Sequence, residues 1–234
     1  MHPLDNPAWN ALTTTQRSIS SGNELARRFE PSVSPIAAVM DSADPACWNA
    51  LAEIVGAGSL VGVFAIAKNA PPEGWTTDWR YTFAQMTCTR ATFKAPASAA
   101  SHPSMRVLTL ADGPAMVDLA ALAQPGPMEV RTVTLGRYLG IFDDDNMLIA
   151  MAGERMRLDG ATEVSGVCTH PEHRGKRYAR LLSAAIAENI LERGDTAFLH
   201  VRDGNAGAAS VYEKLGFEVR AVFDIAAVTK SAKS

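Results

Sequence analysis

Residues 169–179 read Thr169-His170-Pro171-Glu172-His173-Arg174-Gly175-Lys176-Arg177-Tyr178-Ala179. The apolar run before this segment predicts a strand that stops at Pro171, because proline cannot donate to a central ladder. A polar turn follows, and a helical pattern begins at Gly175. The first turn of a helix leaves backbone N–H groups unpaired and carries partial positive charge, so it is a natural place for an anion.

The apolar side chains after this turn fall at i, i+3, i+4 and i+7 spacing, which predicts an amphipathic helix over residues 175–193 with Gly194 as its cap. This apolar stripe consists of Tyr178, Leu181, Leu182, Ala185, Ile186 and Ile190. Arg174, Lys176, Arg177 and Arg180 surround the helix start, and they suit either an anion site or an ordinary solvated turn. A nucleotide P-loop and the G-x-G-x-x-G dinucleotide motif are both absent.

The neighbouring segments alternate between strand and helix. Strands are expected at 106–110, 137–142, 147–152, 163–169, 197–201 and 217–228, and helices at 113–123 and 205–215. The acidic residues of the segment Asp143–Asn146 could hold a metal ion, but a solvated hairpin turn between two strands explains them better. The element order predicts a mixed α/β sheet.

The residues before this region form a second unit of helices and strands. A run of small residues and prolines, Ala95–Pro103, predicts a boundary between an N-terminal α/β domain at 1–103 and a C-terminal domain at 104–230. Within the first domain we expect a helix at 46–55, a strand at 60–67, a turn at 71–74 and a strand at 81–88. The first domain contains all four tryptophans but no constellation of residues that suggests chemistry.

The composition of the 234 residues is 47% hydrophobic and 20% charged, as in an ordinary globular protein. A net charge of -3 argues against nucleic acid as a partner. Three widely spaced cysteines favour a reducing compartment. The first residues lack the pattern of a signal peptide, and the apolar stretch Leu60–Ala67 is too short to cross a membrane. We therefore expect a cytoplasmic protein with no membrane partner, either a monomer or a homodimer.

Two blocks carry a family resemblance. Pro171–Leu182 resembles the acetyl-CoA-binding motif of the GNAT superfamily, Gln/Arg-x-x-Gly-x-Gly/Ala, except that Arg177 stands at the glycine position. Asn205 followed by Ala208–Phe217 resembles the superfamily's helix with a catalytic tyrosine that ends at Gly-Phe. With the element order, the resemblance covers about residues 104–230 and is nearest to the C-terminal domain of glycine N-acyltransferase-like proteins. It implies that the N-terminal half is a degenerate copy of the same fold or a lid over the acceptor.

The resemblance implies an N-acetyltransferase that moves an acetyl group from acetyl-CoA to a primary amine by direct attack in a ternary complex, without a metal. The acceptor would be a small-molecule amine or a peptide N-terminus. Two other functions fit the same sequence. One is a non-catalytic acyl-CoA-binding or sensing module, and the other is an interaction protein that binds no CoA.

The resemblance also implies roles for individual residues. The CoA-binding set is Val167, Cys168, Thr169, Arg174, Gly175, Lys176, Arg177, Tyr178, Ala179 and Asn205. Tyr212 would be the general acid at the thiol. Glu163 would be the base by its match to the glutamate of histone acetyltransferases, and strand alternation predicts that Glu163, Ser165, Val167 and Thr169 share a face. Glu154, a water relay, or salt-bridged glutamates with no catalytic role are the alternatives.

Two further hypotheses assign a chemical role to Cys168. It could accept the acyl group, but a cysteine among apolar strand residues is more often a core residue. Cys168, His170 and His173 could be zinc ligands, but no fourth ligand lies nearby in the sequence.

Overall fold

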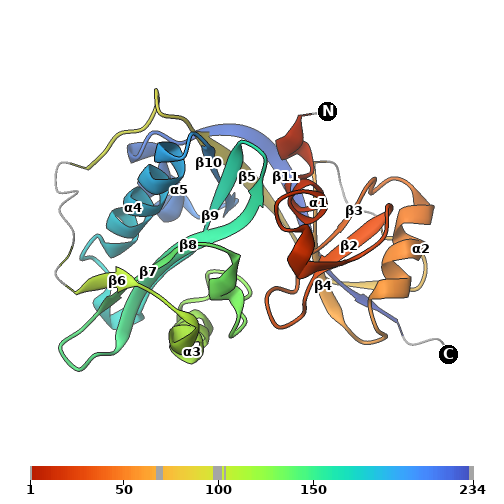
Figure 1. Ribbon diagram of the computed structural model, residues 1–234, viewed down its shortest axis with the longest axis horizontal. Helices are drawn as coiled ribbons and strands as arrows, with labels where there is room; N and C mark the ends of the chain where they lie inside the picture. The colour runs from red at the N-terminus through yellow and green to blue at the C-terminus, as the bar shows by residue number, and fades with distance from the viewer. Residues whose placement is uncertain (1, 67–70, 97–101, 103, 232–234) are drawn as a thin grey trace.

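The computed structural model of the protein describes residues 2–66, 71–96, 102 and 104–231 (Figure 1). The helices in this part of the chain are α1 (Pro7–Thr13), α2 (Pro45–Ile54), α3 (Gly113–Ala123), α4 (Tyr178–Glu192) and α5 (Ala206–Lys214). The strands are β1 (Ser20–Gly22), β2 (Ala26–Phe29), β3 (Ala37–Val39), β4 (Leu60–Ala65), β5 (Trp75–Cys88), β6 (Met105–Val107), β7 (Tyr138–Phe142), β8 (Leu148–Leu158), β9 (Ala161–Thr169), β10 (Thr196–Arg202) and β11 (Glu218–Lys230).

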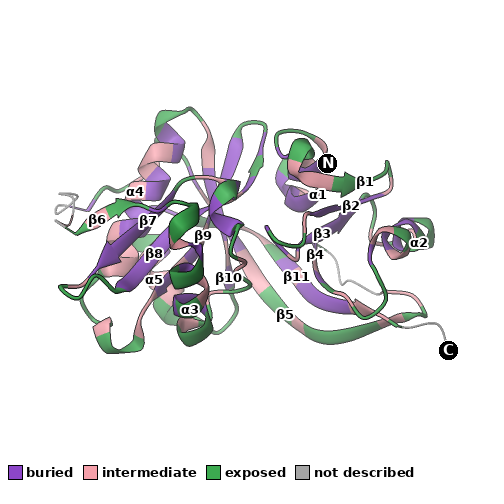
Figure 2. Ribbon diagram, turned by 60° about the horizontal axis from the view of Figure 1, so that its bottom comes forward, coloured by how far each residue is buried: buried purple, intermediate pink, exposed green. Residues whose placement is uncertain are grey.

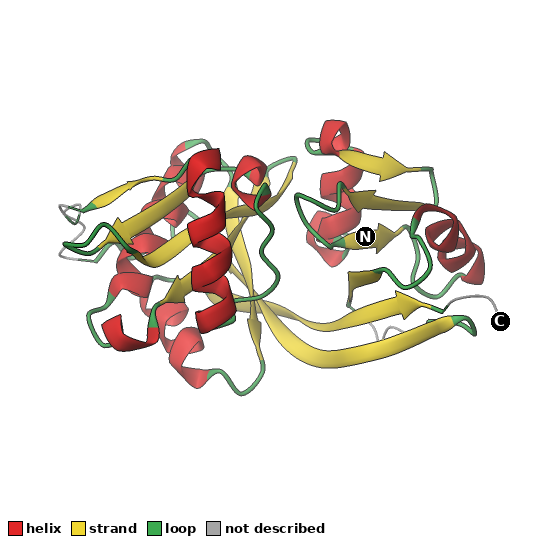
Figure 3. Cartoon of the chain, turned by 90° about the horizontal axis from the view of Figure 1, so that it is seen from below, coloured by secondary structure: helices red, strands yellow, loops and turns green. Residues whose placement is uncertain are grey.

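A large mixed sheet runs through the molecule in the order β4-β11-β5-β10-β9-β8-β7-β6. Its neighbouring strands are antiparallel except for β9 and β10, which are parallel. The molecule has two lobes, and the second is the one that contains α1 and α2 (Figure 1). β5 and β11 form a long curved ribbon that extends from the lobe with α4 and α5 to this second lobe (Figure 3). A smaller sheet, β1-β2-β3, lies beside β4 in the second lobe. The predicted mixed α/β class is confirmed.

Short-range hydrogen bonds explain two elements that the sequence predicted. α2 begins at Pro45, and the Asp44 carboxylate caps it by accepting the Ala46 N–H at 2.8 Å. In the hairpin between β7 and β8, the Asp143 carboxylate accepts the N–H groups of Asp145 and Met147. Asp143 therefore shapes a turn, as predicted, through an Asx-type hydrogen bond.

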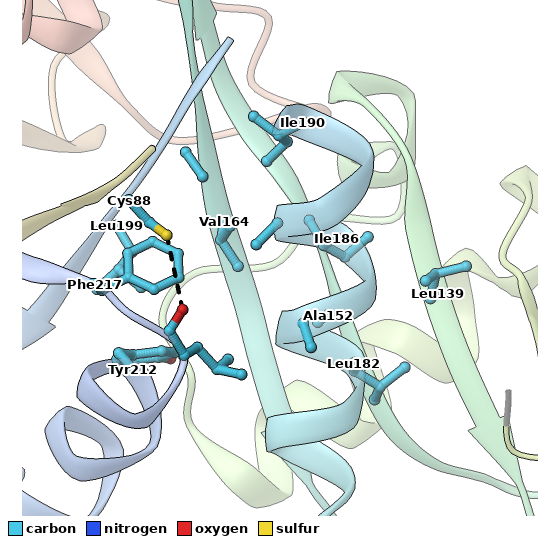
Figure 4. Packing of buried hydrophobic residues seen from close by; sticks show 14 of the residues in the cluster. Cys88, Leu139, Ala152, Val164, Leu182, Ile186, Ile190, Leu199, Tyr212 and Phe217 are labelled. Carbon is cyan, nitrogen blue, oxygen red and sulfur yellow. Dashed lines mark hydrogen bonds between the residues drawn. The ribbon is translucent and has the colours of Figure 1, made fainter. Parts of the chain in front are cut away.

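The main core lies between α4, α5 and one face of the large sheet (Figure 4). Leu182, Ile186 and Ile190 on the apolar stripe of α4 are fully buried. They pack in one cluster with strand residues such as Ala152 and Val164. Burying each large side chain stabilises the fold by about 1.5–3 kcal/mol relative to exposure. In Figure 2 the strands of this region are buried over much of their length.

Several predicted boundaries were wrong by a few residues. α4 begins at Tyr178, not at Gly175, because Gly175 and Arg177 have φ values of 81° and 63° and cannot continue a helix. β5 begins at Trp75, not at Tyr81. β6 ends at Val107, since Leu110–Asp112 forms a 3-10 turn.

The division of the chain at residue 103 stays a prediction. β5, from before that position, lies between β10 and β11, so strands from both sides share the large sheet. Most of the expected linker, residues 97–101 and 103, lies outside the described residues, as does Ala67 at the end of an expected strand. β1, β2, β3 and α1 were not predicted from the sequence.

No helix in the described ranges is both long and apolar enough to pass through a membrane.

Candidate active site

The site begins where β9 and β10 separate. The parallel ladder between them pairs Thr196–Phe198 with Ala161–Glu163 and goes no further along these two fully described strands. Beyond that point β10 stays paired with β5, and β9 stays paired with β8. The strands therefore splay apart and leave an opening in the sheet near α5.

β9 carries a bulge at the opening. Met151 pairs with Cys168 and Gly153 with Ser165, so β9 has one more residue than β8 in this interval. Gly166 adopts a φ of 63°, which is typical of a bulge. The extra residue reverses the alternation, and Val167 packs toward the α4 core while Cys168 packs in the cluster on the other face. The prediction that Val167 shares a face with Glu163 is therefore wrong.

The segment that leads into α4 forms a basic cradle. Pro171–His173 is a 3-10 turn, and Gly175 and Arg177 both take the left-handed conformation before α4 starts. Arg177, at the N-cap position, makes no side-chain capping bond. Because α4 has 15 residues, its open first turn presents unpaired N–H groups and the positive end of the helix dipole.

A cavity of about 920 Å³ lies over this turn. The cations that line it are Arg174, Lys176, Arg177, Arg180 and Lys214. No acidic side chain of the described chain lines it. The Nδ1 atom of His173 and the Nε atom of Arg180 are buried without a hydrogen-bond partner among the described residues. Buried polar atoms of this kind need a partner, so the cradle has the charge and the free donors that a phosphate group satisfies.

Lys214 was missed in the sequence. It lies on α5, and its helical position shares a face with Gly207 and Val211, which also line the cradle. The spacing of these residues at about one helical turn was the signal that could have found it.

A second cavity of about 560 Å³ meets the cradle at the splayed strands. Val167, Asn205 and Ala208 line both cavities. Tyr212, one helical turn after Ala208 on α5, lines the second cavity. The two cavities are therefore joined at the opening between β9 and β10.

Tyr212 is 8% exposed and lies beside Phe217, with ring centroids 6.0 Å apart (Figure 4). Burial raises the pKa of Tyr212 to about 12. Its hydroxyl makes no hydrogen bond within the described part of the chain. The side chain therefore keeps its proton and can still donate it.

Asn205 caps α5, because its side-chain oxygen accepts the Ala208 N–H at 3.1 Å. The amide nitrogen of Asn205 has no partner among the described residues, so it can donate to a ligand at the junction.

Glu163 lies in the second cavity and is fully buried. Arg155 donates to both of its oxygens at 2.8 Å, and Nδ1 of His200 lies 2.9 Å from Oε1. Burial by itself raises the pKa of Glu163, but the charge and hydrogen bonds of Arg155 and the hydrogen bond with His200 outweigh it and hold the pKa at about 2. The backbone N–H of Met156 also donates to Oε2 at 3.4 Å, so Glu163 is an ionised carboxylate held by three partners.

Burial lowers the pKa of His200, although its contact with Glu163 opposes the shift. A neutral His200 that donates from Nδ1 to Glu163 accepts at Nε2, where the Gln85 side-chain amide lies at 3.1 Å. Gln85 in turn bonds to the carbonyl of Leu4 and accepts from Arg220, which pairs with Asp5 at 2.8 Å. This polar network connects the cavity to the N-terminal turn, and no single segment of the chain carries a local signal for it.

The alternative residues for the chemistry were Glu154 as the base, Cys168 as an acyl acceptor and a zinc site. Glu154 is buried against Arg193 at 2.8 Å and lines neither cavity. Burial raises the pKa of Cys168 to about 12, so its thiol remains protonated. Among the described residues, no group of three or more His, Cys, Asp or Glu side chains is placed to hold a metal ion.

Most of the predicted residues meet at these two cavities. The cradle is lined by Val167, Cys168, Thr169, Arg174, Gly175, Lys176, Arg177, Tyr178, Ala179 and Asn205, and the second cavity by Glu163, Val167, Asn205 and Tyr212.

The comparisons with known proteins agree with this geometry. Residues 138–224 match the family described as FR47-like protein. Among curated proteins, none matches the chain. The crystal structure of an acetyltransferase of the GNAT family from Novosphingobium aromaticivorans is 33% identical, with a TM-score of 0.88, and the match covers 99% of this chain and 100% of the other.

Two more distant structures share the fold. A GCN5-related N-acetyltransferase from Kribbella flavida is 18% identical over 97% of this chain and 95% of its own, with a TM-score of 0.65. A tandem GNAT protein from the clavulanic acid biosynthesis pathway is 13% identical over 89% of this chain and 79% of its own, with a TM-score of 0.55.

Proposed function

This chain belongs to the GNAT family of acetyltransferases, and from that premise we propose that it transfers an acetyl group from acetyl-CoA to a primary amine on a small molecule. The observation that carries the proposal is the junction of the two cavities at Val167, Asn205 and Ala208, beside Tyr212. One cavity is suited to a polyanionic donor, and the other shares the lining residues of the junction.

The cradle fits the phosphates of CoA. The first turn of α4 and its surrounding cations would hold the pyrophosphate, and Lys214 adds a cation from α5. The buried Nδ1 of His173 and Nε of Arg180 would gain the partners that they lack among the described residues. Acetyl-CoA supplies the activated acetyl thioester.

Backbone groups of β9 would hold the pantetheine arm like an added strand, because β9 has no ladder partner on that side beyond Glu163. Val167 follows the bulge at Gly166 and lines both cavities, and its backbone N–H would polarise the thioester carbonyl there. The free amide nitrogen of Asn205 would donate to the arm.

Direct attack forms the N–C bond and breaks the C–S bond, so one proton must leave the amine and one must reach the sulfur. Tyr212 is the proposed acid, since a pKa of about 12 keeps its hydroxyl protonated until the thiolate develops. Glu163 is the proposed base. Because its pKa is about 2 and its oxygens are held by protein donors, it would act indirectly, as the fixed negative charge beside which water carries the amine proton to solvent.

The N-terminal half would form much of the acceptor wall, through Ile36, Phe64 and Tyr81. We propose that residues 1–103 are a degenerate GNAT-like domain beside a catalytic domain at 104–230. We propose in addition a relation to the C-terminal domain of glycine N-acyltransferase-like proteins, which residues 104–230 resemble. Three buried cysteines without disulfides support the proposed cytoplasmic location.

The first test is calorimetric titration of the purified protein with acetyl-CoA, CoA and ATP, followed by a screen of amines for acetylation. We expect both CoA species to bind more tightly than ATP and at least one amine to be acetylated. CoA binding without turnover on any amine would indicate the sensing module instead. If neither CoA species binds to folded protein, the acetyltransferase proposal is wrong.

A further inference from the structure

The second cavity, which we call the acceptor cavity, has apolar walls far from the cradle. Its apolar lining comes from one face of the large sheet and includes Leu60, Phe64, Trp79, Tyr81, Phe83 and Ile225. Trp79 and Tyr81 remain 36% and 42% exposed although they are large and aromatic. Exposed aromatic side chains inside a concavity are typical of ligand contact. The body of the acceptor is therefore expected to be apolar.

The charges around the acceptor cavity do not suit an acceptor with several positive groups. Glu163 is the one acidic side chain that lines it among the described residues, and Arg155 and His200 already occupy both of its oxygens. The cationic side chains are Arg155 and Arg202. With His200 neutral, the lining carries an excess of one positive charge, so an anionic group on the acceptor would be attracted.

Of the two arginines that line the cavity, Arg155 pairs with Glu163, whereas Arg202 has no acidic partner among the described residues. It lies at the end of β10, and its guanidinium carbon is 3.8 Å from the centre of the Tyr81 ring. The Tyr81 ring in turn stacks on Trp79, with centroids 5.6 Å apart. Stacking fixes the plane of a guanidinium and leaves its N–H edges free for a carboxylate.

Arg202 is also close in the chain to the junction of the cavities. The N–H of Asn205 donates to the carbonyl of Arg202 at 3.1 Å, and Asn205 lines both cavities. A ligand whose carboxylate and amine are attached to the same carbon could therefore contact Arg202 and present the amine near the junction. An α-amino acid has this arrangement.

We propose that the acceptor is an α-amino acid with an apolar or aromatic side chain, and that Arg202 is a specificity residue that binds its carboxylate. The inference rests on the proposed function and adds the class of the acceptor. Tyr81, which stacks on Trp79, holds Arg202 flat, and both aromatic rings would contact the side chain of the amino acid.

The test compares acceptors that differ at the carboxylate. Acetylation of L-phenylalanine, L-phenylalaninamide and spermidine is measured by CoA release. We expect kcat/KM for phenylalanine to be at least about tenfold higher than for the other two, since a charge-assisted hydrogen bond contributes at this level. The amino group of phenylalaninamide is less basic than that of phenylalanine, so more of it is in the reactive free-base form. This difference favours the amide and therefore works against the expected result. Equal or better use of the amide or spermidine would overturn the proposal.

Variants test the role of Arg202. Arg202→Gln should lower kcat/KM for phenylalanine by about 10- to 100-fold and for phenylalaninamide by less than about twofold. Arg90→Gln removes one positive charge at an exposed residue that lines neither cavity, and it should leave both values unchanged. An equal loss for both acceptors in Arg202→Gln would mean that Arg202 only supports the fold of the cavity, and the proposal would fail.

Binding gives a readout that does not depend on turnover. N-acetyl-L-phenylalanine is titrated calorimetrically into CoA-saturated protein, with N-acetyl-L-phenylalaninamide as the matched ligand. We expect the acid to bind at least about tenfold more tightly, and this preference should disappear in Arg202→Gln. If CoA binds but the acid shows no preference, the acceptor inference alone fails. If CoA does not bind, the proposed function fails and the inference fails with it.

Discussion

Arg177 occupies the position where the GNAT motif has glycine, and its φ of 63° gives a conformational reason for that glycine. The chain must take a left-handed turn here before α4 can begin at Tyr178. Glycine adopts this conformation freely, whereas other residues are disfavoured by roughly 1–2 kcal/mol. In this protein Arg177 adopts the left-handed conformation in spite of this cost, and its side chain adds a cation to the cradle.

Arg177→Gly is therefore expected to raise the free energy of unfolding by about 0.5–1 kcal/mol, because the strain is removed while the unfolded chain gains some freedom. Urea unfolding of the protein without CoA measures the change. Arg177→Ala is the control, since it removes the same charge but keeps a Cβ atom. An equal gain in both variants would assign the effect to charge and not to the backbone.

Tyr212→Phe isolates the proposed acid. The hydroxyl has no partner among the described residues, so its removal should cost little stability. We expect kcat to fall by about 10²-fold, the usual range for a general acid, and the Kd for CoA to change by less than about twofold. Stopped turnover together with an equally large loss of CoA binding would show that Tyr212 is a packing residue.

At the scale of elements, the bulge in β9 decides which side chains meet. Regular alternation would put Val167 on the face of Glu163, but the extra residue at Gly166 turns it to the other side. A Cβ atom at Gly166 would lie 3.1 Å from the Tyr138 ring and 3.2 Å from the Met128 methyl group. The left-handed φ and the close neighbours both favour glycine at this position.

Gly166→Ala is expected to lower the free energy of unfolding by about 1–2 kcal/mol and to reduce kcat/KM, because relaxation of the bulge would move the Val167 N–H. Gly160→Ala is a suitable control. Gly160 also has a positive φ, of 74°, but a Cβ atom there meets nothing within 4 Å. It should lose similar stability from backbone strain while kcat/KM stays unchanged. Equal activity in both variants would contradict a role for the bulge in the reaction.

The elements that sequence analysis predicted are those with a local signal. The stripe of α4, the Asp44-Pro45 helix start and the hairpin at Asp143 are each determined by nearby residues, and each was confirmed. The bulge was missed because Val167 and Cys168 are both apolar, so the reversal of the alternation leaves no visible break in the apolar pattern. β1 and β2 were missed because each has at most four residues, too few to show alternation.

At the scale of the whole molecule, the acceptor cavity depends on contacts between distant parts of the chain. Gln85 on β5 joins Leu4 to His200, and Arg220 on β11 joins Asp5 to the same network. Such pairings have no signature in a single sequence, because each partner alone resembles an ordinary strand residue. Most of the basic cradle comes from one continuous segment, residues 167–180, whereas the lining of the acceptor cavity comes from many separate ones.

The same network predicts how stability depends on pH. The folded state holds His200 with a lowered pKa, so acidification below about pH 6.5 favours the unfolded chain, where the histidine binds a proton freely. Glu163, whose pKa falls from 4.5 to about 2 on folding, adds stability above pH 4.5 that is lost as the pH falls toward 2. Both groups therefore act in the same direction, and the Glu163 part is on the order of 3 kcal/mol.

Urea unfolding at a series of pH values from 7.5 to 3 checks this expectation. Glu163→Gln should lower the free energy of unfolding near neutral pH by about 3 kcal/mol, because Arg155 and His200 lose their common partner. It should also flatten the decline below pH 4.5, since the titrating group is gone. Glu30→Gln is the control, because Glu30 and Arg131 form an exposed pair with both side chains more than 40% accessible, and its removal should cost less than about 1 kcal/mol. If the wild type and Glu163→Gln lose stability in parallel down to pH 3, then the carboxylate that lines the acceptor cavity does not hold the two lobes' polar network together. The stability of that network would then have to come from Gln85 and Arg220.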